Sequence, residues 1–145
     1  MKKIFLTSLV GLFMITGCSQ IKGSFDPVKI AKYSNEISVV TKYVVRLSLK
    51  KQNLTKEQLV QIKYYLVLCQ QTIDLNRVVI FADINTLIDN KVQDPQIKSF
   101  VKSVLSNVER YVNSYQLSTR GEAVKKITQA ALGGALSAID ELSEI

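Results

Sequence analysis

The sequence predicts an all-α protein whose folded part is an up-down-up-down antiparallel four-helix bundle. Helix-start signals recur along the chain at Asp26, Thr55, Asp94 and Thr119. Apolar residues follow each signal at alternating spacings of three and four, which is the period of an amphipathic helix. The connections between the expected helices are short, and short connections force neighbouring helices to run antiparallel.

The first expected helix begins at Asp26-Pro27, where Asp caps the helix and Pro takes its first position. Its apolar residues form a heptad seam of Ile30, Tyr33, Ile37, Val40, Val44 and Leu47. Beside the seam runs a flank of small or β-branched residues, namely Ala31, Ser34, Ser38, Thr41, Val45 and Ser48. A flank of this kind lets another helix approach closely.

The second expected helix begins with a capping box, in which Thr55 is the N-cap and Gln58 lies three residues later. Its apolar positions are Leu59, Ile62, Leu66, Cys69, Ile73, Ile80, Ile84 and Leu87. This unbroken period predicts one long helix over 55–90. The β-branched stretch 77–84 leaves two alternatives open, a strand or a break near 74–76.

The third and fourth expected helices have start signals of the same kinds. Asp94-Pro95 opens a helix with the seam Ile97, Val101, Val104, Val108, Tyr111 and Tyr115. Thr119 and Glu122 form a second capping box, and the helix that follows carries Val124, Ile127, Ala131, Leu136, Ile139 and Leu142. With the first two, these helices complete the predicted bundle.

The first residues of the chain have the layout of a secretory signal peptide. Met-Lys-Lys is a positive start, residues 4–15 are almost entirely apolar, and Thr16 and Gly17 are small. The apolar stretch is too short to span a bilayer comfortably as a helix. We therefore expect export of the protein.

The end of this leader, Ile15-Thr16-Gly17-Cys18, resembles the lipobox of bacterial lipoproteins. The resemblance implies cleavage before Cys18, a diacylglyceryl thioether on its sulfur and an acylated N-terminus. An ordinary signal peptide or an uncleaved anchor is the alternative. The expected organisation is a signal peptide at 1–17, a lipidated cysteine with a tether at 18–25, and a helical domain at 26–145.

The resemblance also implies a location. In enterobacterial lipoproteins an Asp after the cysteine favours the inner membrane, whereas this chain has Ser19. We therefore expect the protein on the periplasmic side of the outer membrane, held by its lipid and not by a spanning helix. Cys69 is then the remaining thiol, and its place on an apolar helical pattern predicts a core residue.

A stripe of small residues, Ala130, Gly134 and Ala138, marks the last expected helix. The spacing of four gives the helix a smooth face, which favours close packing against the first or second helix. A groove for a partner helix or an acyl chain is the alternative. On that alternative the protein is a carrier of a hydrophobic ligand or lipid.

Charge is the second candidate for recognition, because the chain has a formal net charge of +7. In four alternating helices, basic residues gather at the end far from the membrane: Arg46, Lys50, Lys51, Lys56, Arg120, Lys125 and Lys126. Acidic residues such as Asp89, Asp140 and Glu141 gather at the near end. The basic tip predicts an anionic partner, either an envelope protein or an anionic envelope polymer, in preference to nucleic acid. Ordinary solvated helix ends are the alternative.

The sequence does not predict an enzyme. It has no histidine, the commonest general base and metal ligand, and we expect no metal and no cofactor beyond the lipid on Cys18. The prediction is a membrane-anchored recognition or scaffolding module of the envelope. In class it is similar to the exclusion or lysis-accessory lipoproteins of phages and plasmids. An exposed apolar seam on the second helix would be a reason to expect an oligomer.

Overall fold

The computed structural model describes residues 27–76, 79–114 and 121–144, and this part of the chain is helical without strands. Its five helices are α2 (Pro27–Gln52), α3 (Lys56–Leu75), α4 (Phe81–Lys91), α5 (Pro95–Ser114) and α6 (Gly121–Ser143). The prediction of an all-α fold is confirmed. The expected signal peptide, Cys18 and the tether lie outside the described residues.

Two of the predicted helix starts are present with their capping hydrogen bonds. At α3, the Thr55 hydroxyl accepts from the Gln58 N–H at 3.2 Å, and the Gln58 side chain accepts from the Thr55 N–H at 3.0 Å. At α5, the Asp94 carboxylate accepts from the N–H groups of Gln96 and Ile97, at 2.8 and 3.2 Å. These bonds satisfy amide groups that the helix itself leaves unpaired. The Asp26 and Thr119 signals lie outside the described residues.

The single long helix expected over 55–90 is wrong, and the alternative of a break near 74–76 is confirmed, because α3 ends at Leu75 and α4 begins at Phe81. Asn76 is extended, with φ −100° and ψ 142°, and its side-chain amide donates to the Thr72 carbonyl at 2.6 Å. The sequence after it is β-branched, which weakens helix formation. The break lets Phe81, Ile84 and Ile88 turn back into the core, where each is at most 8% exposed. A continuous helix would have carried them away from it.

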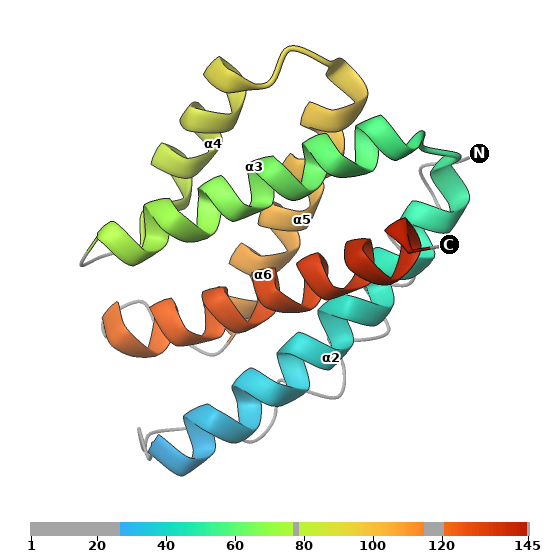
Figure 1. The fold of residues 1–145 in the computed structure, drawn as a ribbon. Coiled ribbons are helices and arrows are strands. Elements are labelled where there is room, and N and C mark those ends of the chain that lie inside the picture. The colour runs from blue at the N-terminus through green and yellow to red at the C-terminus, as the bar shows by residue number, and fades with distance from the viewer. Residues whose placement is uncertain (1–26, 77–78, 115–120, 145) are drawn as a thin grey trace.

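The arrangement of the helices differs from the expected up-down-up-down order, which is not confirmed. Gly134 of α6 lies against Ser38 of α2, and Glu141, further along α6, pairs with Lys42 and Arg46, further along α2. Helices α2 and α6 therefore run in the same direction (Figure 1). The break after α3 explains this, because one additional reversal inverts the direction of every later helix.

Helix α6 lies between α3 and α2 (Figure 1), and it contacts α2, α3 and α5. Its large side chains Ile127, Leu132 and Ile139 are at most 1% exposed. Helices α4 and α5 pack on each other beyond α3. Helix α2 packs mainly on α6, and this contact is built from small residues.

The face of α2 that enters the core shares only Ile37 with the heptad seam. Its buried residues are Ile37, Thr41, Val45 and Leu49, spaced by four, whereas Tyr33, Val40, Val44 and Leu47 are only half-buried. Rows spaced by four on both helices pack in the class that crosses at about 50°, and α6 crosses α2 obliquely (Figure 1). The expectation that the small flank admits a close helix is confirmed, and the partner is α6.

Candidate recognition surfaces

A group of ion pairs joins the last turns of α6 to α2 and α3. Glu141 pairs with Lys42 and, at 3.3 Å, with Arg46, while Asp140 pairs with Lys63 at 2.5 Å. The hydrogen bond from Lys42 lowers the pKa of Glu141, helped by the charges of Lys42 and Arg46. The pairs are solvent-exposed, so each contributes little stability. They connect the end of α6 to both α2 and α3.

The structure does not bring the expected basic tip together. Lys50, Lys51 and Lys56 lie around the turn that joins α2 to α3, whereas Lys125 and Lys126 lie in the first turns of α6. The start of α6 lies by the end of α3, because the Lys125 ammonium donates to the Asp74 carbonyl at 2.8 Å. Arg46 belongs to the ion pairs with Glu141, and Arg120 lies outside the described residues. The expected single patch is therefore divided between the two ends of the fold.

The expected acidic end is divided for the same reason. Asp140 and Glu141 lie among Lys42, Arg46 and Lys63, and Asp89 accepts from Lys102 at 2.9 Å. Each of these three acidic residues thus lies beside a basic side chain. The additional reversal after α3 exchanges the ends of α5 and α6, so the predicted separation of charge, which assumes the opposite helix directions, does not form.

The small-residue stripe of α6 is occupied by α2. Gly134 and Ala138 are buried, and Ala130 is half-buried. A Cβ built on Gly134 would lie 2.9 Å from the carbonyl carbon of Ser38 and 3.1 Å from its Cα, and closer still to its oxygen. The backbones of α2 and α6 therefore touch at this point, and the stripe is a packing face. The structure places no groove for a ligand between α2 and these residues.

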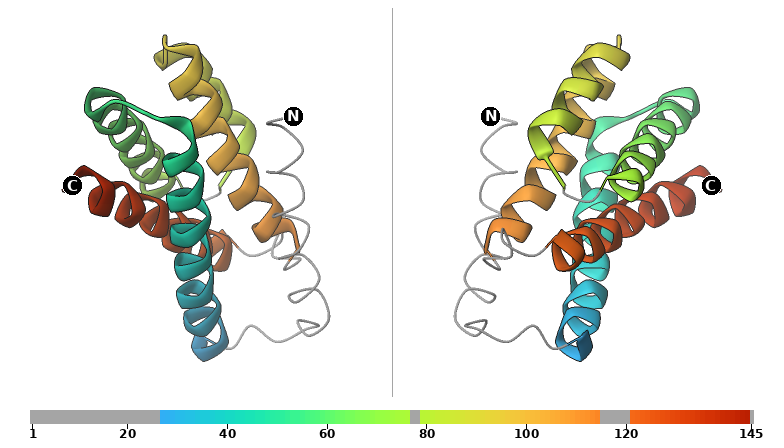
Figure 2. Two further views of the ribbon diagram at one scale, coloured as in Figure 1. Left: turned by 90° about the vertical axis from the view of Figure 1, so that its right-hand side faces the viewer. Right: turned by 90° about the vertical axis from the view of Figure 1, so that its left-hand side faces the viewer.

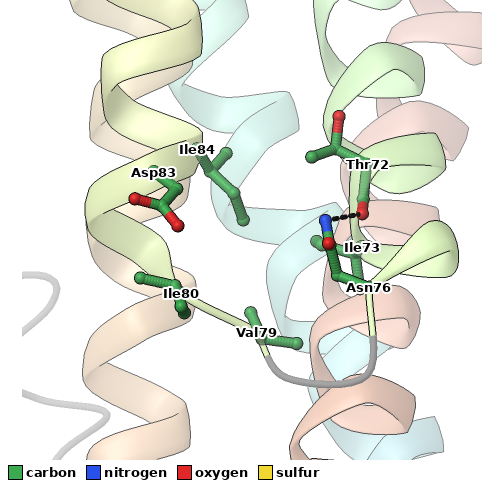
Figure 3. A pocket seen from close by; sticks show the side chains of 7 residues that line it. All are labelled: Thr72, Ile73, Asn76, Val79, Ile80, Asp83 and Ile84. Atoms are coloured by element: carbon green, nitrogen blue, oxygen red, sulfur yellow. Dashed lines mark hydrogen bonds between the residues drawn. The ribbon is translucent and has the colours of Figure 1, made fainter.

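A small pocket that the sequence did not indicate lies at the corner between α3 and α4 (Figure 3). It is lined by Thr72, Ile73, Asn76, Val79, Ile80, Asp83 and Ile84. Its volume is about 50 Å³, far below the range of small-molecule sites. The pocket results from the break in the expected long helix, so a continuous helix could not have predicted it. Its polar groups are one carboxylate, one hydroxyl and one amide already bonded to Thr72.

Cys69 is fully buried in α3, and burial raises the pKa of its thiol to about 12. A thiol with this pKa is unreactive, because the thiolate is the nucleophile. The interpretation of Cys69 as a core residue is thus confirmed. Among the described residues, no three or more acidic or cysteine side chains come together as a metal site. None of the described helices combines the length and apolarity that a membrane span requires.

Comparison of the chain with protein-family models, with curated proteins and with solved structures finds no match. The evidence for function therefore lies in the residues of this chain alone.

Proposed function

We propose that this protein is a lipid-anchored, non-catalytic recognition or scaffolding module of the bacterial cell envelope. The observation that carries the proposal is the order of features at the start of the chain, in which two lysines, the apolar residues 4–15 and a small residue precede Cys18. A diacylglyceryl group with a further acyl chain gives stable membrane attachment, because each buried CH₂ contributes about 0.8 kcal/mol. Ser19 after the cysteine supports the periplasmic side of the outer membrane as the location.

Replacement of Cys18 with serine tests the anchor. The serine hydroxyl cannot take part in lipoprotein processing at the thiol, so we expect loss of acylation and release of a full-length or misprocessed chain from the membrane fraction. Labelling with a radioactive fatty acid, together with mass spectrometry of the N-terminus, measures both effects. Cys69→Ser is the matched control and should keep its label. Unchanged membrane retention of Cys18→Ser without label would refute the lipid anchor.

The turn between α2 and α3 is the surface that we propose for recognition. Helix α2 has 26 residues, and at 1.5 Å per residue Lys50 lies about 35 Å from Pro27 along the helix. The anchor precedes Pro27 in the chain, so Lys50, Lys51 and Lys56 are at the far end of the first helix. Lys50 and Lys56 are exposed. Three cations on one turn support an anionic partner, either an acidic protein face or an anionic envelope polymer.

Charge reversal at this turn tests the recognition surface. Lys50→Glu with Lys56→Glu should reduce the amount of the partner that co-purifies with the lipoprotein in mild detergent by about tenfold, which corresponds to 1.4 kcal/mol. Arg110→Glu with Lys126→Glu is the matched control, because it makes the same change in net charge at exposed residues near the junction of α5 and α6. Equal loss in both variants would indicate an effect of net charge and would contradict a defined surface at the turn.

A further inference from the structure

The outer side of α3 carries apolar residues that are exposed or half-buried, among polar ones. Val60, Tyr64 and Leu75 are 63%, 62% and 87% exposed, and Val67 and Leu68, on the same side of the helix, are half-buried. The inner side is formed by the buried residues Leu59, Ile62, Leu66, Cys69 and Ile73. Apolar residues that lie together on the side of a helix away from the core are typical of contact surfaces. We call the set Val60, Tyr64, Val67, Leu68 and Leu75 the α3 outer stripe.

Helix α5 shows what a solvent-facing side looks like in the same protein. Beyond the helix's first residue, Pro95, the exposed residues of α5 are all polar: Gln96, Ser99, Ser106, Arg110, Asn113 and Ser114. Helix α2 is closer to α3 in this respect, since its Val39 and Tyr43 are 68% and 56% exposed. In Figure 2, no other described helix lies beyond α3 on its outer side. The α3 outer stripe thus lacks a partner within the described part of the chain.

We propose that the α3 outer stripe packs against the same stripe of a second copy of this chain, with the two α3 helices antiparallel. The outward positions between Glu57 and Asp74 carry no charge, since Gln61 and Gln71 are the polar residues there. The stripe extends over about 22 Å of the helix at 1.5 Å per residue. Its partner must be uncharged over this length, and a second stripe meets that requirement.

The order of residues makes the stripe complementary to itself when it is reversed. A two-fold axis between Val67 and Leu68 places these two residues against each other across the interface. The same axis places Val60 opposite Leu75 and Tyr64 opposite Gln71, where the phenol can donate to the amide oxygen. The contact is isologous and closes after two copies. Antiparallel α3 dipoles also favour this arrangement over a parallel one.

Charge supports the antiparallel direction. Parallel packing would set Glu57 beside its own copy, and like charges in contact are unfavourable. Antiparallel packing separates the two Glu57 carboxylates by more than the length of the stripe. Asp74 lies outside this comparison, because its carboxylate accepts from the Gln129 side chain of α6. A membrane surface is a poorer fit, because helices that lie in the interface carry Lys and Arg beside the apolar face. Gln61 and Gln71 flank this stripe instead, and the nearby Lys63 is paired with an acidic residue of α6.

Single-cysteine cross-linking in the native membrane fraction tests the inference. Leu68→Cys lies next to the two-fold axis and should form a covalent dimer on mild oxidation. Leu75→Cys is the matched control: it is more exposed, but its two copies would lie about 22 Å apart, and a disulfide requires Cα atoms within about 7 Å. The chain without an added cysteine gives the background, to which buried Cys69 contributes little because of its raised pKa of about 12.

The expected result is a dimer for Leu68→Cys and none above background for Leu75→Cys. Addition of Tyr64→Glu should slow the Leu68→Cys cross-link about tenfold, while addition of Ser99→Glu on α5 should leave it unchanged. Equal cross-linking of both cysteine variants would indicate a parallel or unspecific contact and would overturn the proposal. So would the absence of a dimer for both Leu68→Cys and Val67→Cys. The inference depends on α3 alone, and the fatty-acid label reports the anchor separately.

Discussion

Replacement of Gly134 with alanine is expected to lower the free energy of unfolding by about 2 kcal/mol. Alanine is the better helix former by about 1 kcal/mol, so in an open position the change would stabilise the protein. At Gly134 the added methyl group would meet the backbone of Ser38, with 2.9 Å to its carbonyl carbon. A backbone atom cannot rotate away as a side chain can, so α2 must shift as a whole. Overpacking of this kind costs about 1–3 kcal/mol or more.

Gly133 supplies the matched control, because it precedes Gly134 in the same helix and a Cβ built on it meets nothing within 4 Å. Gly133→Ala should raise the free energy of unfolding by about 0.5–1 kcal/mol through helix propensity alone. Equilibrium denaturation of the two variants in guanidinium chloride measures both values. If Gly134→Ala were as stable as Gly133→Ala, the close contact between α2 and α6 would be wrong.

Replacement of Leu132 with alanine is expected to have a still larger effect, a loss of about 2–5 kcal/mol. Leu132 is fully buried in α6, and α6 contacts α2, α3 and α5. Truncation there removes apolar contacts and leaves a cavity that packed helices on both sides cannot easily fill. A loss of this size is a large part of the stability of a small domain.

Leu136, one turn further along α6, is the control for this prediction. It has the same side chain but is only half-buried, so Leu136→Ala should cost clearly less than Leu132→Ala. Circular dichroism during denaturation gives both free energies. Equal losses for the two leucines would contradict the deeper burial of Leu132.

The sequence was sufficient to predict the local structure, namely the helix caps and the helical class. The caps at Thr55 and Asp94 are as predicted, because a capping box needs only residues that are close in the chain. The helical class is also as predicted, since apolar spacing is a local signal. The end of α3 is only the alternative that the sequence leaves open, because the period of apolar residues continues through it and favours one long helix, whereas the turn at Asn76 depends on the packing of Phe81 and later residues in the core.

One local error had global consequences for the predicted surfaces. A single missed reversal inverted α5 and α6 relative to α2, and the predicted gathering of charge at two ends depended on those directions. Lys125 and Glu141 thus lie at the ends opposite to those expected. The stripe around Gly134 was interpreted correctly because small residues at a spacing of four predict close packing whichever way the helices run.

The choice of face on α2 shows a further limit of pattern analysis. Its heptad seam is more apolar than the small flank beside it, yet Thr41 and Val45 are buried whereas Val40 and Val44 are only half-buried. The distance between the two helix backbones decides which face of α2 is buried. Gly134 and the alanines beside it let a helix face with small side chains approach more closely than a face with large side chains. That preference belongs to the pair of helices and is not visible in either sequence segment alone.

The nearly exclusive packing of α2 on α6 has a mechanical consequence. Tension that reaches the fold through the chain ahead of Pro27 is applied first to α2, and the contact with α6 resists it. Because the two helices run in the same direction, a pull along α2 slides it past Gly134 and strains the bonds from Lys42 and Arg46 to Glu141 at the same time. The α2–α6 crossing is therefore the point at which stretching would first open this protein, while α3, α4 and α5 remain packed on one another.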